Sequence, residues 1–131
     1  MSDRLVKEWI KKAEEDYAGA LHLMKRKKGA LHSLVCFHAQ QCVEKYLKAY
    51  LTSMGIPFPK THDLGDLQDL IIPRDGSFAF MTDLADFLSQ YAARFRYPGE
   101  EADRTESRKT VQAMEEIRRF VRHKLRGRKE G

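Results

Sequence analysis

The sequence has few of the features that mark secreted or membrane-spanning proteins. It contains two cysteines and four prolines among 131 residues. No uninterrupted apolar run approaches the roughly 18 residues that a bilayer span requires. The first five residues, MSDRL, lack the apolar stretch of a secretory signal. We therefore expect a cytoplasmic protein that makes no contact with a membrane.

Ligands for a metal or a cofactor are equally scarce. The five histidines lack paired helical spacing with carboxylates or thiols, which a site of three or four ligands would need. No glycine-rich phosphate loop is present. Cys36 and Cys42 lie six positions apart in one expected helix, so they point to different faces and cannot easily form a disulfide. We expect two buried thiols, no metal and no cofactor.

The composition is that of one small folded domain. Hydrophobic residues make up 42% of the chain and charged residues 33%, which gives enough apolar surface for a single core. We therefore treat 1–131 as one domain, with a basic tail from about residue 126 that we expect to fray. The formal charge is +5, and the segment from Arg104 to Gly131 holds ten Lys and Arg against four Glu. Such a segment can attract RNA, nucleotides or an acidic protein surface, and a solvated helix end explains it equally well.

Apolar residues recur at spacings of three and four along most of the chain, which is typical of helices with one buried face. Gly29, Pro73, Pro98-Gly99 and the segment 55–59 interrupt this pattern. Few residues are β-branched and no stretch alternates strictly, so strands are not expected. The sequence predicts an all-α fold, an up-and-down helical bundle of four long helices and one short helix. The expected helices cover residues 5–24, 30–54, 64–72, 80–95 and 104–125, of which 30–54 is the most buried.

Four groups of residues form a combination that is more specific than any one of them: Trp9, Ala13, Asp16 and Tyr17; the segment 36–45 (CFHAQQCVEK) with Leu47, Lys48 and Ala49; the segment 59–64 (PKTHDL); and Arg96, Tyr97 and Pro98. Together they resemble the HEPN family, named for its occurrence in higher eukaryotes and prokaryotes. The resemblance implies a helical bundle that is frequently a homodimer, and often the operon partner of a minimal nucleotidyltransferase. It also implies nucleotide or RNA binding, and many members of the family are RNases that act as toxins.

The RNases of the family carry an Arg followed, about four to six residues later, by a His near the start of the last long helix. In such a pair the His acts as general acid or base while the Arg stabilises the phosphate. Here Arg94 or Arg96 would need a His within 99–103, and that segment has none. Arg118 and His123 have the required spacing but lie deep in the last expected helix. They are the one catalytic pair we retain as an alternative, and we do not expect an enzyme on this pattern.

The first candidate binding site is the break before Pro98. Arg94, Arg96 and Tyr97 could present two guanidinium groups and a phenol to a phosphate, because the arginine fork matches two oxygens at once. Equally, the two arginines could flank a helix C-terminus, where cations are favoured, while Tyr97 packs.

The second candidate is the polar strip of the expected central helix. The strip consists of His38, Gln41, Glu44, Lys45 and Lys48. Polar residues on a buried helix need partners or water, which a ligand-binding cleft would supply. A dimer interface or a salt-bridged edge explains the strip equally well. Three further residues have structural interpretations. Asp16, inside the first apolar stripe, needs a charged or hydrogen-bonding partner, either a basic residue or a neighbouring helix. His62 and Asp63 are expected to cap the short helix.

The combined hypothesis is a homodimeric module that binds a nucleotide or RNA and acts with a minimal nucleotidyltransferase, in a two-component system like a toxin–antitoxin pair. Two alternatives belong to other classes: a metal-independent RNase toxin, and a structural adaptor whose basic tail docks on an acidic partner.

Overall fold

The described residues form five α-helices, four of which are arranged around a central one. The computed structural model describes residues 3–26, 31–94 and 98–130, of which 128–130 are described through the backbone alone. No strand occurs within these described ranges, as the sequence predicts. The helices are α1 (Asp3–Met24), α2 (His32–Ser53), α3 (Leu64–Ile71), α4 (Thr82–Ser89) and α5 (Arg104–Glu130).

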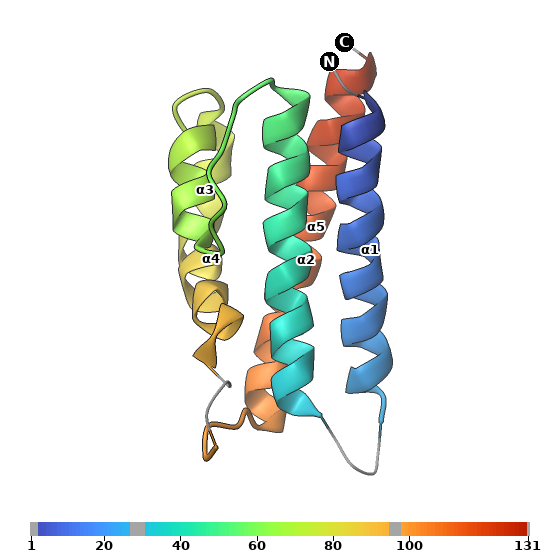
Figure 1. The fold of residues 1–131 in the computed structure, drawn as a ribbon, viewed down its shortest axis with the longest axis vertical. Coiled ribbons are helices and arrows are strands. Elements are labelled where there is room, and N and C mark those ends of the chain that lie inside the picture. The colour runs from blue at the N-terminus through green and yellow to red at the C-terminus, as the bar shows by residue number, and fades with distance from the viewer. Residues whose placement is uncertain (1–2, 27–30, 95–97, 131) are drawn as a thin grey trace.

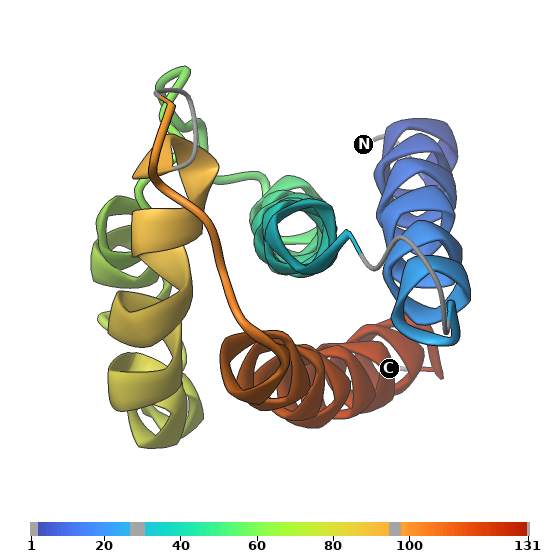
Figure 2. The same ribbon diagram turned by 90° about the horizontal axis from the view of Figure 1, so that it is seen from below.

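Helix α2 lies in the middle of the bundle. Seen along its axis, α1, α5 and the α3–α4 pair surround it on three sides (Figures 1 and 2). Apolar residues of α2 therefore point in most directions, which is why its sequence is apolar around well over half of the helix. The largest fully buried side chains include Tyr46, Leu47 and Leu51 of α2, packed with Met114 and Ile117 of α5. The prediction that 30–54 is the central helix is confirmed.

The fourth predicted helix, 80–95, is shorter and is flanked by 3₁₀ turns. Gly76–Met81 and Gln90–Ala92 are 3₁₀ helices, and only Thr82–Ser89 between them is α-helical. The first turn begins where the Asp75 carboxylate accepts a hydrogen bond from the Ser77 backbone amide, at 3.1 Å. Phe78 and Met81 are both fully buried, and a spacing of three residues suits the 3₁₀ period better than the α-helical one.

Two further observations concern the whole chain. Among the residues that the structure describes, no helix combines the length and apolarity that crossing a membrane would require. Both thiols are free and buried, as predicted. Burial raises the pKa of Cys36 to about 11 and that of Cys42 further still, so neither is a reactive thiolate near neutral pH.

Candidate functional site

The side of α2 that no other helix covers carries the polar strip. At about 100° per residue, Leu31, Leu34, His38, Gln41 and Lys45 fall within a sector of about 80°. Helix α1 borders this face on one side. On the other side runs the segment 55–63, which leads from the end of α2 to α3 (Figure 1). We call this the open face of α2.

Asp16 of α1 holds two residues of the open face. One carboxylate oxygen lies 2.8 Å from His38 Nδ1, and the other accepts a hydrogen bond from Lys45 Nζ at 2.5 Å. A carboxylate can only accept, so Nδ1 of His38 is the protonated nitrogen. Burial alone would raise the pKa of Asp16, but the bonds from His38 and Lys45 outweigh it and hold the pKa below its ordinary value. The predicted basic partner of Asp16 is therefore confirmed.

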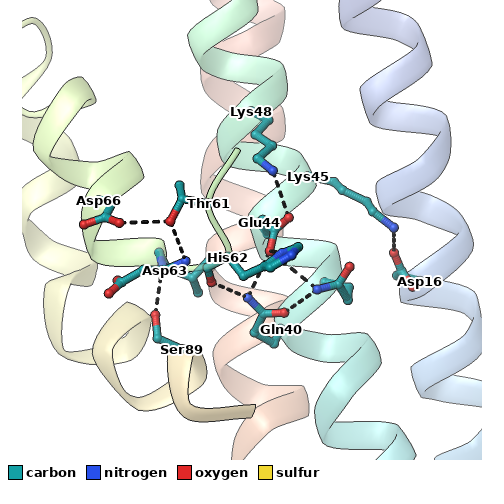
Figure 3. Close-up of polar contacts among 12 residues, drawn as sticks. Asp16, Gln40, Glu44, Lys45, Lys48, Thr61, His62, Asp63, Asp66 and Ser89 are labelled. Carbon is teal, nitrogen blue, oxygen red and sulfur yellow. Dashed lines mark hydrogen bonds and ion pairs between the residues drawn. The ribbon is translucent and has the colours of Figure 1, made fainter. Parts of the chain in front are cut away.

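Glu44 is the second buried carboxylate, and it lies on α2 itself. One oxygen lies 3.0 Å from His62 Nδ1 and accepts a bond from Gln40 Nε2 at 3.2 Å, while the other accepts a bond from Lys48 Nζ at 2.9 Å. Figure 3 shows Glu44 between these three residues and Lys45 reaching across to Asp16. Only 4% of the Glu44 side chain is exposed. The two carboxylates thus share one arrangement, in which each holds a histidine through Nδ1 and a lysine through Nζ.

The segment 55–63 is fixed to α2 by these contacts. Gln40 donates a second hydrogen bond to the backbone carbonyl of His62, at 3.0 Å. Lys48 Nζ lies 5.6 Å from the centre of the Trp9 ring and 5.9 Å from that of Phe58, so its charge is covered by two aromatic faces. With 9% of its side chain exposed, Lys48 belongs to the support of the site and not to its accessible surface.

The groups that a ligand could reach are the two histidines, Lys45 and Gln41. The His62 side chain is 66% exposed, and His38, Gln41 and Lys45 are half-buried. Because Nδ1 of each histidine is bonded to a carboxylate, Nε2 is the nitrogen left to accept or donate a hydrogen bond. The open face therefore offers two oriented imidazoles, one ammonium and one amide, which can bind an oxyanion or transfer a proton.

The other sequence candidates are not brought together in this way. Arg94 donates to Glu106 at 2.5 Å and to Gln90 at 3.0 Å, and it lies over the Tyr91 ring. These contacts join the end of the α4 region to the start of α5. Arg96 and Tyr97 lie outside the described residues.

Arg118 and His123 point in different directions. The Arg118 guanidinium forms a two-bonded fork with Glu14, both bonds 2.8 Å long, and it stacks on Tyr17 with 3.8 Å between its central carbon and the ring centre. The fork lowers the pKa of Glu14 and raises that of Arg118. His123 is exposed, and five residues of helix rotate it about 140° away from Arg118. The structure thus places Arg118 in the packing between α1 and α5.

Two members of the site were not singled out for function from the sequence. His62 was expected to cap α3, but the cap is Asp63, whose carboxylate accepts from the Gly65 backbone amide at 2.8 Å. Gln40 sits on the buried side of the strip and was not considered. Only the path of the segment 55–63 brings His62 to Glu44, 18 residues away in sequence. Among the described residues, no three metal-ligating side chains are grouped so as to hold a metal ion.

Comparisons with known proteins agree with this fold. The HEPN domain family matches residues 6–124. The crystal structure of an archaeal HEPN homologue is similar, with 25% sequence identity and a TM-score of 0.72 over 92% of this chain and 97% of that one. The crystal structure of TT1696 from Thermus thermophilus has 21% identity and a TM-score of 0.76 over 91% and 97% of the two chains, a likeness of fold. The comparison with curated protein sequences gives no match.

Proposed function

This chain belongs to the HEPN family, and from that premise we propose that it binds a nucleotide, free or within RNA, on the open face of α2. The observation that carries the proposal is the pair of buried carboxylates, Asp16 and Glu44, which hold His38 and His62 through Nδ1. Each imidazole is thereby fixed with Nε2 as its remaining polar atom. A ligand that carries phosphate would take hydrogen bonds from Lys45, and from Nε2 of each imidazole once that ring is protonated.

Fixed donors suit an anionic ligand better than mobile ones. Lys45 is already held by Asp16, so little side-chain entropy is lost when it binds a further oxygen. Protonation of His38 and His62 would add positive charge without any rearrangement, because their carboxylate partners are in place. Gln41 adds an amide that can contact a sugar hydroxyl or a base edge.

A homodimer is the second part of the proposal. Leu31, Leu34 and Phe37 lie on or beside the first turns of the open face and are among the few large apolar side chains that are exposed, with 43% of Leu34 accessible. Contact of this apolar end with the same end of a second copy would bury it through a self-complementary interface. The two polar halves would then remain accessible on either side. Size-exclusion chromatography with light scattering should give a dimer that Leu34→Glu converts to a monomer.

The expected protein partner is a minimal nucleotidyltransferase, which the family resemblance implies. A small nucleotidyltransferase encoded beside this chain, and co-purification of the two, would support a two-component system. Independent purification of both proteins without any association would contradict it.

Isothermal titration with AMP, ATP and GTP tests the binding site itself. His62→Ala removes the most exposed donor of the site, and Lys60→Ala is a matched control two residues away on the same segment. A hydrogen bond to a charged group contributes about 1.5–3 kcal/mol, so His62→Ala should weaken binding by about ten-fold or more while Lys60→Ala changes it little. Nucleotide binding that persists unchanged in both His62→Ala and His38→Ala would refute the site.

Metal-independent RNase activity is the alternative that one observation favours. A carboxylate bonded to Nδ1 orients an imidazole for proton transfer at Nε2, and both His38 and His62 have this arrangement. The Arg118 and His123 pair is the other candidate. Cleavage of RNA by the purified protein in EDTA, lost in His62→Ala or in His123→Ala, would identify which histidine acts. Intact RNA after incubation would leave binding as the function.

A further inference from the structure

The outward side of α5 carries a row of five arginines. At about 100° per residue, these positions fall within a sector of about 60°, and the row is about 33 Å long. The buried residues Ser107, Met114, Ile117 and Val121 lie on the other side of the helix. The row consists of Arg104, Arg108, Arg119, Arg122 and Arg126.

Lysines of α1 lie beside this row. Glu14 of α1 forms the fork with Arg118, and its carboxylate lies 3.8 Å from Arg122, so the two helices are joined at this level. They run in opposite directions and lie side by side (Figures 1 and 2). Lys11 and Lys7, one and two turns before Glu14 on the same side of α1, are therefore at the level of the arginines that follow Arg118. We call the row and these two lysines the basic seam.

Most of the positive charge of the basic seam is not neutralised. Arg104, Arg108, Arg119 and Arg126 are exposed, and none forms an ion pair with a side chain that the structure describes. Two nearby carboxylates, Glu14 and Glu115, have other partners. Glu14 is taken by Arg118 and by the Tyr46 hydroxyl.

Glu115, on the same side of α5, is bonded to Tyr17, which raises the pKa of that phenol. Glu14 and Glu115 thus serve the packing of α1 on α5 and leave the exposed arginines of the row available.

We propose that the basic seam binds the phosphate backbone of single-stranded nucleic acid. Each guanidinium presents a fork of donors that matches two phosphate oxygens. A nucleic-acid strand carries its phosphates in a line. A strand therefore matches a straight row of arginines better than a compact anion does. A membrane surface is disfavoured because the exposed large apolar residues, Leu5, Leu31, Leu34, Phe37 and Phe80, lie elsewhere and leave the seam without an apolar anchor.

This surface is separate from the open face of α2. The seam lies where α1 meets α5, whereas the open face lies between α1 and the segment 55–63 (Figure 2). The seam consists of arginines and lysines alone, and we expect these cations to contact the phosphates that every nucleotide carries. Binding should therefore be independent of sequence, and RNA and DNA of one sequence should bind alike.

Two variants of equal charge test the proposal in the full chain. Lys11→Glu with Arg119→Glu reverses two cations of the seam. Lys12→Glu with Lys109→Glu reverses two exposed cations on other sides of the same helices and serves as the control. All four side chains are exposed, so both variants should keep the native circular dichroism spectrum and melting temperature.

Fluorescence anisotropy would measure the binding of labelled RNA and DNA strands of about a dozen nucleotides. The seam variant should bind at least about ten-fold more weakly than the control. Its plot of log K against log salt should be shallower by about 0.7 for each phosphate that the variant no longer neutralises. Isothermal titration with AMP should give the same affinity for the seam variant and for the control, which separates this surface from the nucleotide site on the open face.

Three results would overturn the proposal. Equal weakening in the seam and control variants would indicate attraction by net charge alone. Displacement of the strand by polyglutamate as readily as by unlabelled strand would indicate a surface for acidic proteins. Absence of binding to either strand at low salt would leave the seam without this role.

Discussion

The ion pair between Glu44 and Lys48 allows a direct test of how the site is built. Both side chains are nearly inaccessible, with 4% and 9% exposed, so solvent screens the pair little. Glu44→Leu would leave the Lys48 ammonium buried without its carboxylate. Removing one partner of a buried pair costs about 3–5 kcal/mol. With a urea m-value of about 2 kcal/mol/M, the midpoint of unfolding should fall by about 2 M.

The paired variant Glu44→Leu with Lys48→Leu distinguishes a buried charge from a simple loss of packing. Replacing both partners by apolar residues removes the charge together with its need for a partner, so most of the lost stability should return. Urea titrations followed by circular dichroism at pH 7 give both free energies of unfolding, and the cycle of variants gives the coupling between the two residues.

The pair of Arg4 and Glu8 supplies the control. It has the same spacing on a helix, but its side chains are 91% and 56% exposed. Glu8→Ala should cost no more than about 0.5 kcal/mol. If Glu44→Leu costs as little as Glu8→Ala, then Lys48 is hydrated in solution and the description of Glu44 as a buried support is wrong.

Three further predictions concern stability. Asp103→Ala removes the carboxylate that accepts from the Glu106 backbone amide at the start of α5, and thermal unfolding should show a loss of about 1 kcal/mol. The pKa of Asp16 lies below its ordinary value of 3.8 in the folded protein. The ionised carboxylate therefore stabilises the fold at a pH above 3.8, and this stabilisation is lost as the pH falls through the pKa of the folded state. The stability difference between the native chain and Asp16→Asn should therefore shrink on acidification, and a constant difference would contradict this. Gly19 lies inside α1 with the His38 ring 3.7 Å from where a β-carbon would be, so Gly19→Ala should stabilise the protein by about 0.5–1 kcal/mol, whereas a loss of stability in urea titration would show that no space is available.

The helical fold could be predicted because periodicity is a local property. The apolar positions of α1, α2 and α5 repeat over many turns, so each helix and its buried side can be derived without knowing its neighbours. The α4 region is different. The spacing of Phe78 and Met81 suits a 3₁₀ turn, but the same residues also fit an amphipathic α-helix, so periodicity alone does not decide between them.

The candidate site could be predicted only on its α2 side. His38, Gln41 and Lys45 share one face by their spacing alone. The partners come from elsewhere: Asp16 from α1, and His62 from a segment without periodicity whose path depends on Gln40 and Glu44. Lys48 belongs to the same predicted strip, but it is covered because Trp9 and Phe58 approach from two distant parts of the chain. By contrast, the separation of Arg118 and His123 follows from helix geometry alone.

The two buried carboxylates under one helix face, Asp16 and Glu44, are costly in free energy. A buried ion pair seldom stabilises a protein more than apolar residues of similar size would, so stability alone does not explain them. The proposed function supplies another explanation, in which each carboxylate orients one imidazole by its Nδ1 so that Nε2 meets the ligand. The variant Glu44→Leu with Lys48→Leu separates the two explanations: it should be nearly as stable as the native protein, yet His62 would lose its partner and nucleotide affinity should fall with it. If stability and affinity instead returned together, the carboxylates would be serving the packing of the segment 55–63 and not the ligand.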